Sequence, residues 1–279
     1  MEIKKNKLML LFLLPFVILV IGFEILPLIS VVLGSFKNSE GNFTFLQYRT
    51  IFTNKFYIQG FTNSLKISFY SSFVGIIVAV IGSYSISRLS NKIKERVLML
   101  SNMTSNFAGI PLAFAFMILL GNNGIMTLIG KRFGISFLGN FNLYSVTGLI
   151  MSYIYFQIPL GILLLYPSYD ALKGEWKEAA TVLGASKLKF WRYIGIPLVL
   201  PSILGTFSIL FANAMGAYST AVALTSGNYN LLSIRIAALI SGDMYLNPEL
   251  ASALGIMLGA IVVFTNLVNE FISSKRRMS

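Results

Sequence analysis

Residues 175–197 read EWKEAATVLGASKLKFWRYIGIP, a pattern that predicts two short helices joined by a turn. Apolar side chains recur there at i, i+3, i+4 and i+7, which places them on one face of a helix. They are Trp176, Ala179, Ala180 and Leu183. Gly184 suits the position just past a helix end, which often has a positive φ, and Ser186 suits the cap of the next helix. The apolar face of this segment then packs either on the ends of its own spans or on another protein.

On both sides of this segment the chain consists of apolar blocks of about twenty residues, the length at which a helix crosses a hydrocarbon core of ~30 Å. Hydrophobic residues make up 56% of the chain and charged residues 11%, against about 25% charged residues in a soluble domain. We therefore expect an all-α polytopic membrane protein with six spanning helices. The predicted spans are Leu8–Phe36, Leu65–Ser87, Val97–Leu120, Tyr144–Tyr166, Pro201–Leu224 and Ala251–Ile272.

The distribution of basic residues predicts the orientation of these spans. Of the 22 Lys and Arg residues, 15 lie in the two terminal segments and in the loops after the second and fourth spans. Because basic residues accumulate on the cytoplasmic side, both termini and residues 175–197 are expected in the cytoplasm. We predict an N-terminal helix and external loop at 1–60, a five-helix core at 61–273 and a basic tail at 274–279.

The residues that are missing exclude several classes of function. The chain has no Cys and no His, so a disulfide, a thiolate zinc site and a Ser-His-Asp triad are all impossible. No predicted span holds two carboxylates. We therefore expect no catalytic residue, no metal and no cofactor. The net charge of +12 is explained by basic residues that flank spans in a lipid bilayer, and no nucleic-acid partner is expected.

The spacing within residues 178–197 resembles a known motif. Glu178-Ala179-Ala180 is followed after three residues by Gly184, after nine more by Ile194, and then by Ile196-Pro197. This is similar to the EAA motif of permease subunits of binding-protein-dependent type I ABC importers, which reads EAA-x3-G-x9-I-x-L-P. The only departure is Ile196 in place of Leu, a substitution that nearly conserves volume.

The resemblance implies a type I importer permease fold with a cytoplasmic coupling helix within 168–197, and it covers roughly residues 60–273. It implies that Glu178, Ala179, Ala180 and Gly184 contact a separate ATPase subunit, so that this chain is not itself an enzyme. The implied partners also include a second permease, homologous or identical, and an extracytoplasmic solute-binding protein.

The resemblance also suggests a solute, although less specifically. The stretch from Gly216 to Ile234 is most similar to the polyamine (spermidine/putrescine) permease group, which makes a polyamine the best guess. Permeases for phosphonate, ferric iron, thiamine or another small polar solute remain alternatives.

Polar side chains inside the spans predict where the solute passes. Such groups normally face the interior of a helix bundle. We expect a path lined by Gln157, Asn213 and Tyr218, with interhelical hydrogen bonding as the alternative role of each. Further polar side chains in the third and fifth spans are Asn102, Thr104, Ser105, Asn106, Ser219 and Thr220.

Two other classes of protein were weighed against the importer. A channel or secondary transporter predicts intramembrane charges for ion coupling, and only Glu24, Lys66 and Glu270 come close. A membrane enzyme predicts a catalytic cluster, and none is visible without His or Cys.

Overall fold

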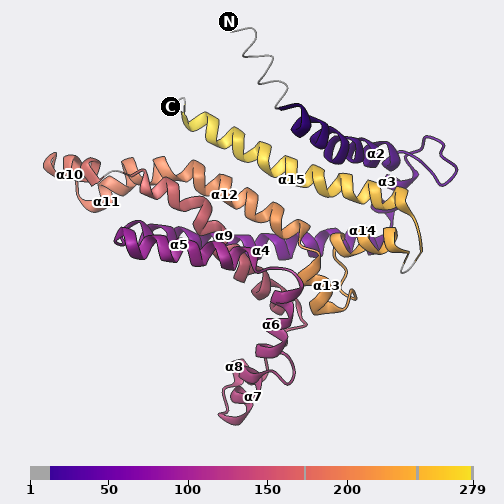
Figure 1. The fold of residues 1–279 in the computed structure, drawn as a ribbon, viewed down its shortest axis with the longest axis horizontal. Helices are drawn as coiled ribbons and strands as arrows, with labels where there is room; N and C mark the ends of the chain where they lie inside the picture. Colours follow the sequence, from indigo (N-terminus) through magenta and orange to yellow (C-terminus); the bar gives the residue numbers. More distant parts are fainter. Residues whose placement is uncertain (1–12, 173, 243–244, 278–279) are drawn as a thin grey trace, which may run out of the picture. The chain divides into compact units, whose positions relative to one another are not determined.

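The regular structure of the described residues consists of helices (Figure 1). The structure is a computed structural model that describes residues 13–172, 174–242 and 245–277. In these ranges the only strand-like pairing is an isolated bridge between Lys37 and Phe43. After the helical residues 13–20 the elements are a π-helical turn Ile21–Ile25, α2 Leu26–Ser35, α3 Leu46–Thr53, α4 Lys55–Ser87, α5 Asn91–Asn106, α6 Ile110–Leu120, α7 Ile125–Arg132, α8 Ser136–Gly139, α9 Val146–Asp170, α10 Gly174–Val182, α11 Lys187–Phe190, a π-helical turn Trp191–Gly195, α12 Ile196–Gly216, α13 Ser219–Thr225, α14 Leu232–Ser241 and α15 Pro248–Arg277.

Six helical segments among the described residues are long and apolar enough to cross a membrane, which confirms the predicted number. They are Leu13–Ser35, Lys55–Ser87, Ile110–Arg132, Val146–Asp170, Lys187–Gly216 and Pro248–Phe271. The predicted first, second, fourth and sixth spans fall on four of these segments. Lys4, Lys5 and Lys7, which entered the orientation argument, lie outside the described residues.

The predicted bounds of the third and fifth spans are wrong, because a helix break falls inside each of them. The predicted span Val97–Leu120 contains the end of α5 and the start of α6, and the apolar segment Ile110–Arg132 begins only after that break. The predicted span Pro201–Leu224 runs through the break between α12 and α13. A hydropathy window averages over such interruptions, because apolar residues on at least one side raise the mean.

The chain divides into two compact units, each of which has its own buried residues. Unit 1 holds the described residues up to Ile58 together with Arg235–Ala260, and its buried side chains include Ile51, Leu239 and Leu250. Unit 2 holds Gln59–Ile234 and the residues from Ile261 onward.

Two apolar clusters form the core of unit 2. The first lies between α6, α9 and α13, and the second between α4, α9 and α12. Their buried members include Leu112, Leu149, Tyr153 and Leu224 in the first, and Ala79, Leu165, Val199 and Leu210 in the second. Since α9 contributes to both, it is the central helix of this unit.

The ends of α5 and α9 are joined by an ion pair. Lys94 Nζ lies 3.0 Å from Asp170 Oδ1, and this hydrogen bond raises the pKa of Lys94 above its ordinary value. Because the Asp170 side chain is half exposed, the pair fixes a geometry more than it adds stability.

Candidate functional site

A polar pocket lies where two helices of unit 2 are interrupted. The breaks fall between α5 and α6 and between α12 and α13. Residues of both breaks, with three apolar residues of α9, line a cavity of about 600 Å³. Its polar side chains are those of Asn102, Ser105, Asn106, Asn213, Tyr218, Ser219 and Thr220. The two breaks adjoin the ends of the apolar segments Ile110–Arg132 and Lys187–Gly216, and irregular backbone is expected where it lines a cavity.

One threonine connects the two breaks. Gly109 lies between α5 and α6 with a φ of 77°, a conformation that side-chain-bearing residues rarely adopt. Its backbone N–H donates to Thr220 Oγ1 at 2.9 Å, and the same hydroxyl donates to the Gly109 carbonyl at 3.3 Å. Thr220 is only 2% exposed. The Gly109 N–H at the first break is therefore satisfied by a side chain of the second break, and the Gly109 carbonyl also accepts from the Ala113 N–H at 3.1 Å.

A side chain of the central helix α9 forms a hydrogen bond with the second break. Ala217 has extended backbone with a ψ of 93°, and its carbonyl accepts a 2.6 Å hydrogen bond from the Tyr153 hydroxyl. Tyr153 lies in α9 and is 1% exposed. This buried bond fixes the position of the residue that precedes Tyr218.

The structure brings two of the three predicted path residues together. Asn213, near the end of α12, and Tyr218, in the break, both line the pocket and are exposed. Gln157 lies in α9 but is not among the residues that line this pocket.

Gln157 instead forms hydrogen bonds between helices. It is fully buried, and its Nε2 donates to Ser72 Oγ at 3.1 Å and to the Leu210 carbonyl at 2.9 Å. A Cβ placed on Gly75 would lie 3.0 Å from the Gln157 Cβ, so α4 and α9 approach closely here. The contacts of Gln157 are those of a residue that joins α4, α9 and α12.

The last turns of α5 line the pocket through Asn102, Ser105 and Asn106. The sequence alone identifies these residues only as polar side chains within a predicted span. Asn102 and Asn106 lie one helical turn apart, and Asn106 Nδ2 donates to the Asn102 carbonyl at 2.8 Å. The signal for the break was present in the sequence. A polar run ends at Asn106 and is followed by Gly109 and Pro111.

The pocket carries no formal charge. None of its lining residues is Asp, Glu, Lys or Arg. Its apolar lining includes the rings of Phe156 and Tyr218. The arrangement can therefore donate and accept hydrogen bonds but cannot neutralise an ion.

The segment 175–197 has the predicted local structure. The N–H of Ala185 donates to the Ala180 carbonyl and that of Gly184 to the Thr181 carbonyl, both at 2.9 Å. Gly184 has a φ of 79°, and this pair of bonds is the Schellman ending of a helix. Ser186 Oγ accepts from the Lys189 N–H at 3.3 Å and caps α11.

The apolar side chains of this segment point mostly into solvent. Val182 and Leu183 are each 86% exposed and Leu188 is 80% exposed. Of the residues named by the motif, Glu178, Ala179 and Gly184 are exposed, and Ala180 is buried. The predicted apolar face is thus only partly covered by the described residues of this chain.

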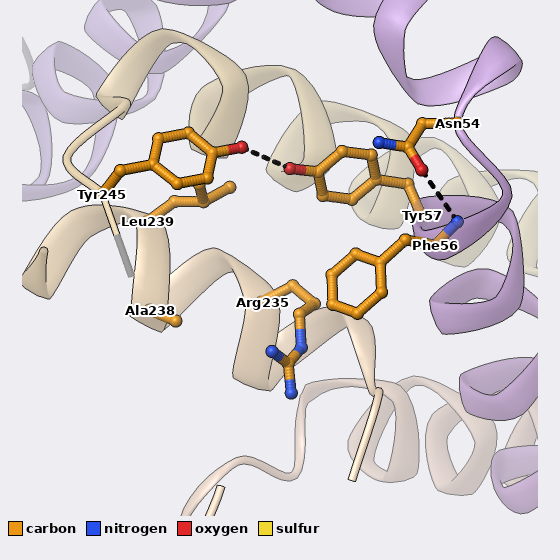
Figure 2. Close-up of a pocket in the computed structure, with 7 residues that line it drawn as sticks. All are labelled: Asn54, Phe56, Tyr57, Arg235, Ala238, Leu239 and Tyr245. Carbon is orange, nitrogen blue, oxygen red and sulfur yellow. Dashed lines mark hydrogen bonds between the residues drawn. The ribbon is translucent and has the colours of Figure 1, made fainter. Parts of the chain in front are cut away.

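A second pocket lies within unit 1, and the sequence did not indicate it (Figure 2). It measures about 230 Å³ at the start of α4. The hydroxyls of Tyr57 and Tyr245 lie 2.7 Å apart, and the Arg235 guanidinium lies 5.1 Å from the centre of the Phe56 ring. The phenols and the cation–π contact join the start of α4 to α14 and to the residue Tyr245 beyond it.

Six apolar helices and an uncharged polar pocket at two helix breaks define an integral membrane protein of the transport class. The chain belongs to the family of binding-protein-dependent transport system inner membrane components, which matches residues 71–278. It is a type I ABC importer permease, and the family is a transport component and not a catalytic enzyme.

Curated relatives show low identity to this chain. It is 25% identical over 251 residues to the putative ferric transport system permease protein FbpB 1 of Haemophilus influenzae, with 88% of this chain covered but only 38% of the relative. It is 24% identical over 215 residues to the spermidine/putrescine transport system permease protein PotC homolog of Mycoplasma genitalium, covering 77% of this chain and 70% of the relative.

The fold is also similar to that of a solved structure. This is a chain of a bacterial alginate ABC transporter in complex with an alginate pentasaccharide-bound periplasmic protein. The TM-score is 0.76 at 17% identity, over 98% of this chain and 96% of that chain. The type I importer permease fold expected from the sequence is confirmed.

Proposed function

We propose that this chain is one of two permease subunits that together enclose a solute path through the cytoplasmic membrane. ATP hydrolysis takes place on a separate subunit, and an extracytoplasmic binding protein delivers the solute. Both termini lie in the cytoplasm, residues 61–273 form the permease core and 274–279 form a basic tail. The solved structure of the alginate transporter, which contains a periplasmic protein in the complex, supports the delivery step.

The observation that carries the coupling role is the exposure of apolar side chains in α10, in α11 and in the turn between them. Val182, Leu183 and Leu188 are at least 80% exposed in a segment predicted to lie outside the membrane. Covering each of them is worth about 1.5–3 kcal/mol, which favours a protein partner. Glu178, Ala179, Ala180 and Gly184 lie in the same segment. The exposed Glu178, Ala179 and Gly184 form the contact with the ATPase, and the buried Ala180 supports the helix that presents them.

Gly184 supplies the sharpest test of this contact. A Cβ at this position would meet no atom within 4 Å, so the strain of a substitution comes from the φ of 79° alone. Gly184→Val replaces the residue with one that strongly resists this backbone, whereas Gly184→Asn introduces a side chain that tolerates it. We expect Gly184→Val to abolish ATP-driven solute uptake in proteoliposomes of the assembled transporter, and Gly184→Asn to retain most of it.

Leu183 tests the surface itself. Leu183→Glu is expected to reduce the amount of ATPase subunit that copurifies with this chain, and Leu183→Met is expected to leave it unchanged. If Gly184→Val and Leu183→Glu both support normal uptake, the coupling role is excluded. A chain that moves solute without any ATPase would instead be a secondary transporter.

The pocket at the two helix breaks is proposed as this chain's part of the solute path. Asn213 and Tyr218 line it. Gln157 has a supporting role, because its hydrogen bonds join α9 to α4 and α12. The second permease subunit closes the path from the opposite side.

A polyamine is the solute that the sequence predicts, and two relatives named for spermidine and putrescine support it. The names of other relatives refer to iron, sulfate, trehalose and thiamine at comparable identity. A polyamine therefore stays a prediction, which uptake of labelled spermidine by the assembled transporter tests.

A further inference from the structure

The chemistry of the pocket at the helix breaks restricts the kind of solute that it binds, given its proposed role in the path. The described acids of unit 2 are Glu95, Asp170, Glu175, Glu178 and Glu270, and none of them lines the pocket. Asp170 is already paired with Lys94. No Lys or Arg lines it either.

A highly charged solute is poorly matched to such a wall. Moving an ion out of water costs several kcal/mol even after the surroundings relax, and opposite charges normally compensate this cost. Spermidine would bring several ammonium groups to a surface without a carboxylate. Sulfate would likewise meet no guanidinium or ammonium group.

The same side chains are well matched to an uncharged solute that carries many hydroxyls. Amide and hydroxyl groups both donate and accept, as sugar hydroxyls do. Asn102 and Asn106 present two amides from one face of α5, and Asn213 presents a third from α12. The ring of Tyr218, which is 40% exposed, supplies apolar surface for the C–H faces of such a solute.

The size of the pocket and the exposure of its polar groups agree with this chemistry. A volume of about 600 Å³ lies within the usual range of ~300–1,000 Å³ for small-molecule sites. Asn102, Asn106, Asn213 and Tyr218 are exposed at its surface. A wall of exposed amides is too costly to face lipid and is suited to a hydrated or hydroxylated occupant.

We infer that this pocket binds an uncharged polyhydroxylated solute, a sugar or polyol, in preference to a polycation or an inorganic anion. This inference rests on the proposed function and narrows the solute class of the same path. The binding energy comes from several neutral hydrogen bonds and one ring contact, so we expect weak binding that permits release.

The test uses the assembled transporter with its ATPase, second permease and binding protein in proteoliposomes. The probes are glucose, trehalose and sorbitol, with spermidine and sulfate as charged comparisons. We expect ATP hydrolysis and uptake to rise with at least one neutral probe and with neither ion.

Variants of this chain then test whether the pocket contributes to solute selectivity. The binding protein is the same in every sample, so any difference between variants comes from this chain. Asn213→Leu removes a side chain that can form one or two hydrogen bonds, so the solute concentration for half-maximal ATPase stimulation should rise about 3–10-fold. Asn91→Leu, an exposed Asn in the first turn of α5 and outside the pocket, should leave it unchanged.

Stimulation by spermidine or sulfate, or by no neutral probe, overturns the inference. So does an Asn213→Leu transporter with unchanged solute dependence. These results differ from a failure of the proposed function, in which the chain neither copurifies with an ATPase nor supports any ATP-dependent uptake.

Discussion

At the scale of single residues, buried polar side chains of this chain form hydrogen bonds with backbone groups of other helices and of the helix breaks. Thr220 bonds both backbone groups of Gly109, and Tyr153 bonds the carbonyl of Ala217. Gln157 bonds the carbonyl of Leu210 within α12. A polar residue in a span is therefore not by itself a solute ligand, and its hydrogen-bond partners separate the two roles.

Gln157→Leu separates these roles by experiment. The substitution removes two interhelical hydrogen bonds, each worth about 0.6 kcal/mol on average and up to ~1.7 kcal/mol in a membrane bundle. We expect a loss of about 1–3 kcal/mol, seen as a lower midpoint in thermal unfolding of the detergent-solubilised transporter.

Asn213→Leu is the matched comparison, since Asn213 is exposed in the pocket. It should retain the unfolding midpoint. A Gln157→Leu transporter with an unchanged midpoint and altered solute dependence would place Gln157 in the path, as the sequence alone had suggested.

At the scale of elements, the α5–α6 and α12–α13 breaks shape the pocket. Four ordinary spans were predictable from apolar runs, and so was the helix–turn–helix at 175–197, because Gly184 and Ser186 mark its turn. The polar run that ends at Asn106, with Gly109 and Pro111 after it, marks the first break, but the predicted span runs across it; the second break, at Ala217, has no proline to mark it. What distinguishes them is a tertiary contact between Gly109 and Thr220, residues 111 positions apart.

Thr220→Val tests the bond between the breaks. Valine has nearly the shape of threonine but lacks the hydroxyl, so the Gly109 N–H loses its hydrogen bond, whereas the Gly109 carbonyl keeps the bond from the Ala113 N–H. An unsatisfied buried group costs about 1–3 kcal/mol. We expect a lower unfolding midpoint and slower uptake. Thr220→Ser, which keeps the hydroxyl, should recover most of both, and equal behaviour of Val and Ser at this position would contradict a structural role for the bond.

At the scale of the whole molecule, the absence of cysteine gives direct access to the orientation of the chain in the membrane. The chain has no native Cys, so a single introduced thiol reports on its own position. Glu40 lies between the first two spans, and Lys187 lies at the start of α11. Both side chains are exposed.

With both termini in the cytoplasm, Glu40→Cys should react with a membrane-impermeant maleimide in intact cells. Lys187→Cys should react only after the membrane is permeabilised. The cysteine-free parent chain is the control for background labelling. Labelling of Lys187→Cys in intact cells would reverse the orientation predicted from the basic residues.

The two proposed roles of the chain fall on separate stretches of sequence. The pocket uses residues within 102–109, 156–163 and 213–220, whereas the exposed apolar surface lies within 182–188. If these roles hold, selection for a different solute acts on the pocket residues, and selection for coupling to the ATPase acts on the exposed apolar surface. A transporter of this family can then change its solute through a few substitutions in the pocket, while the residues that contact the ATPase stay the same. Relatives that are named for unrelated solutes are the expected result of this separation.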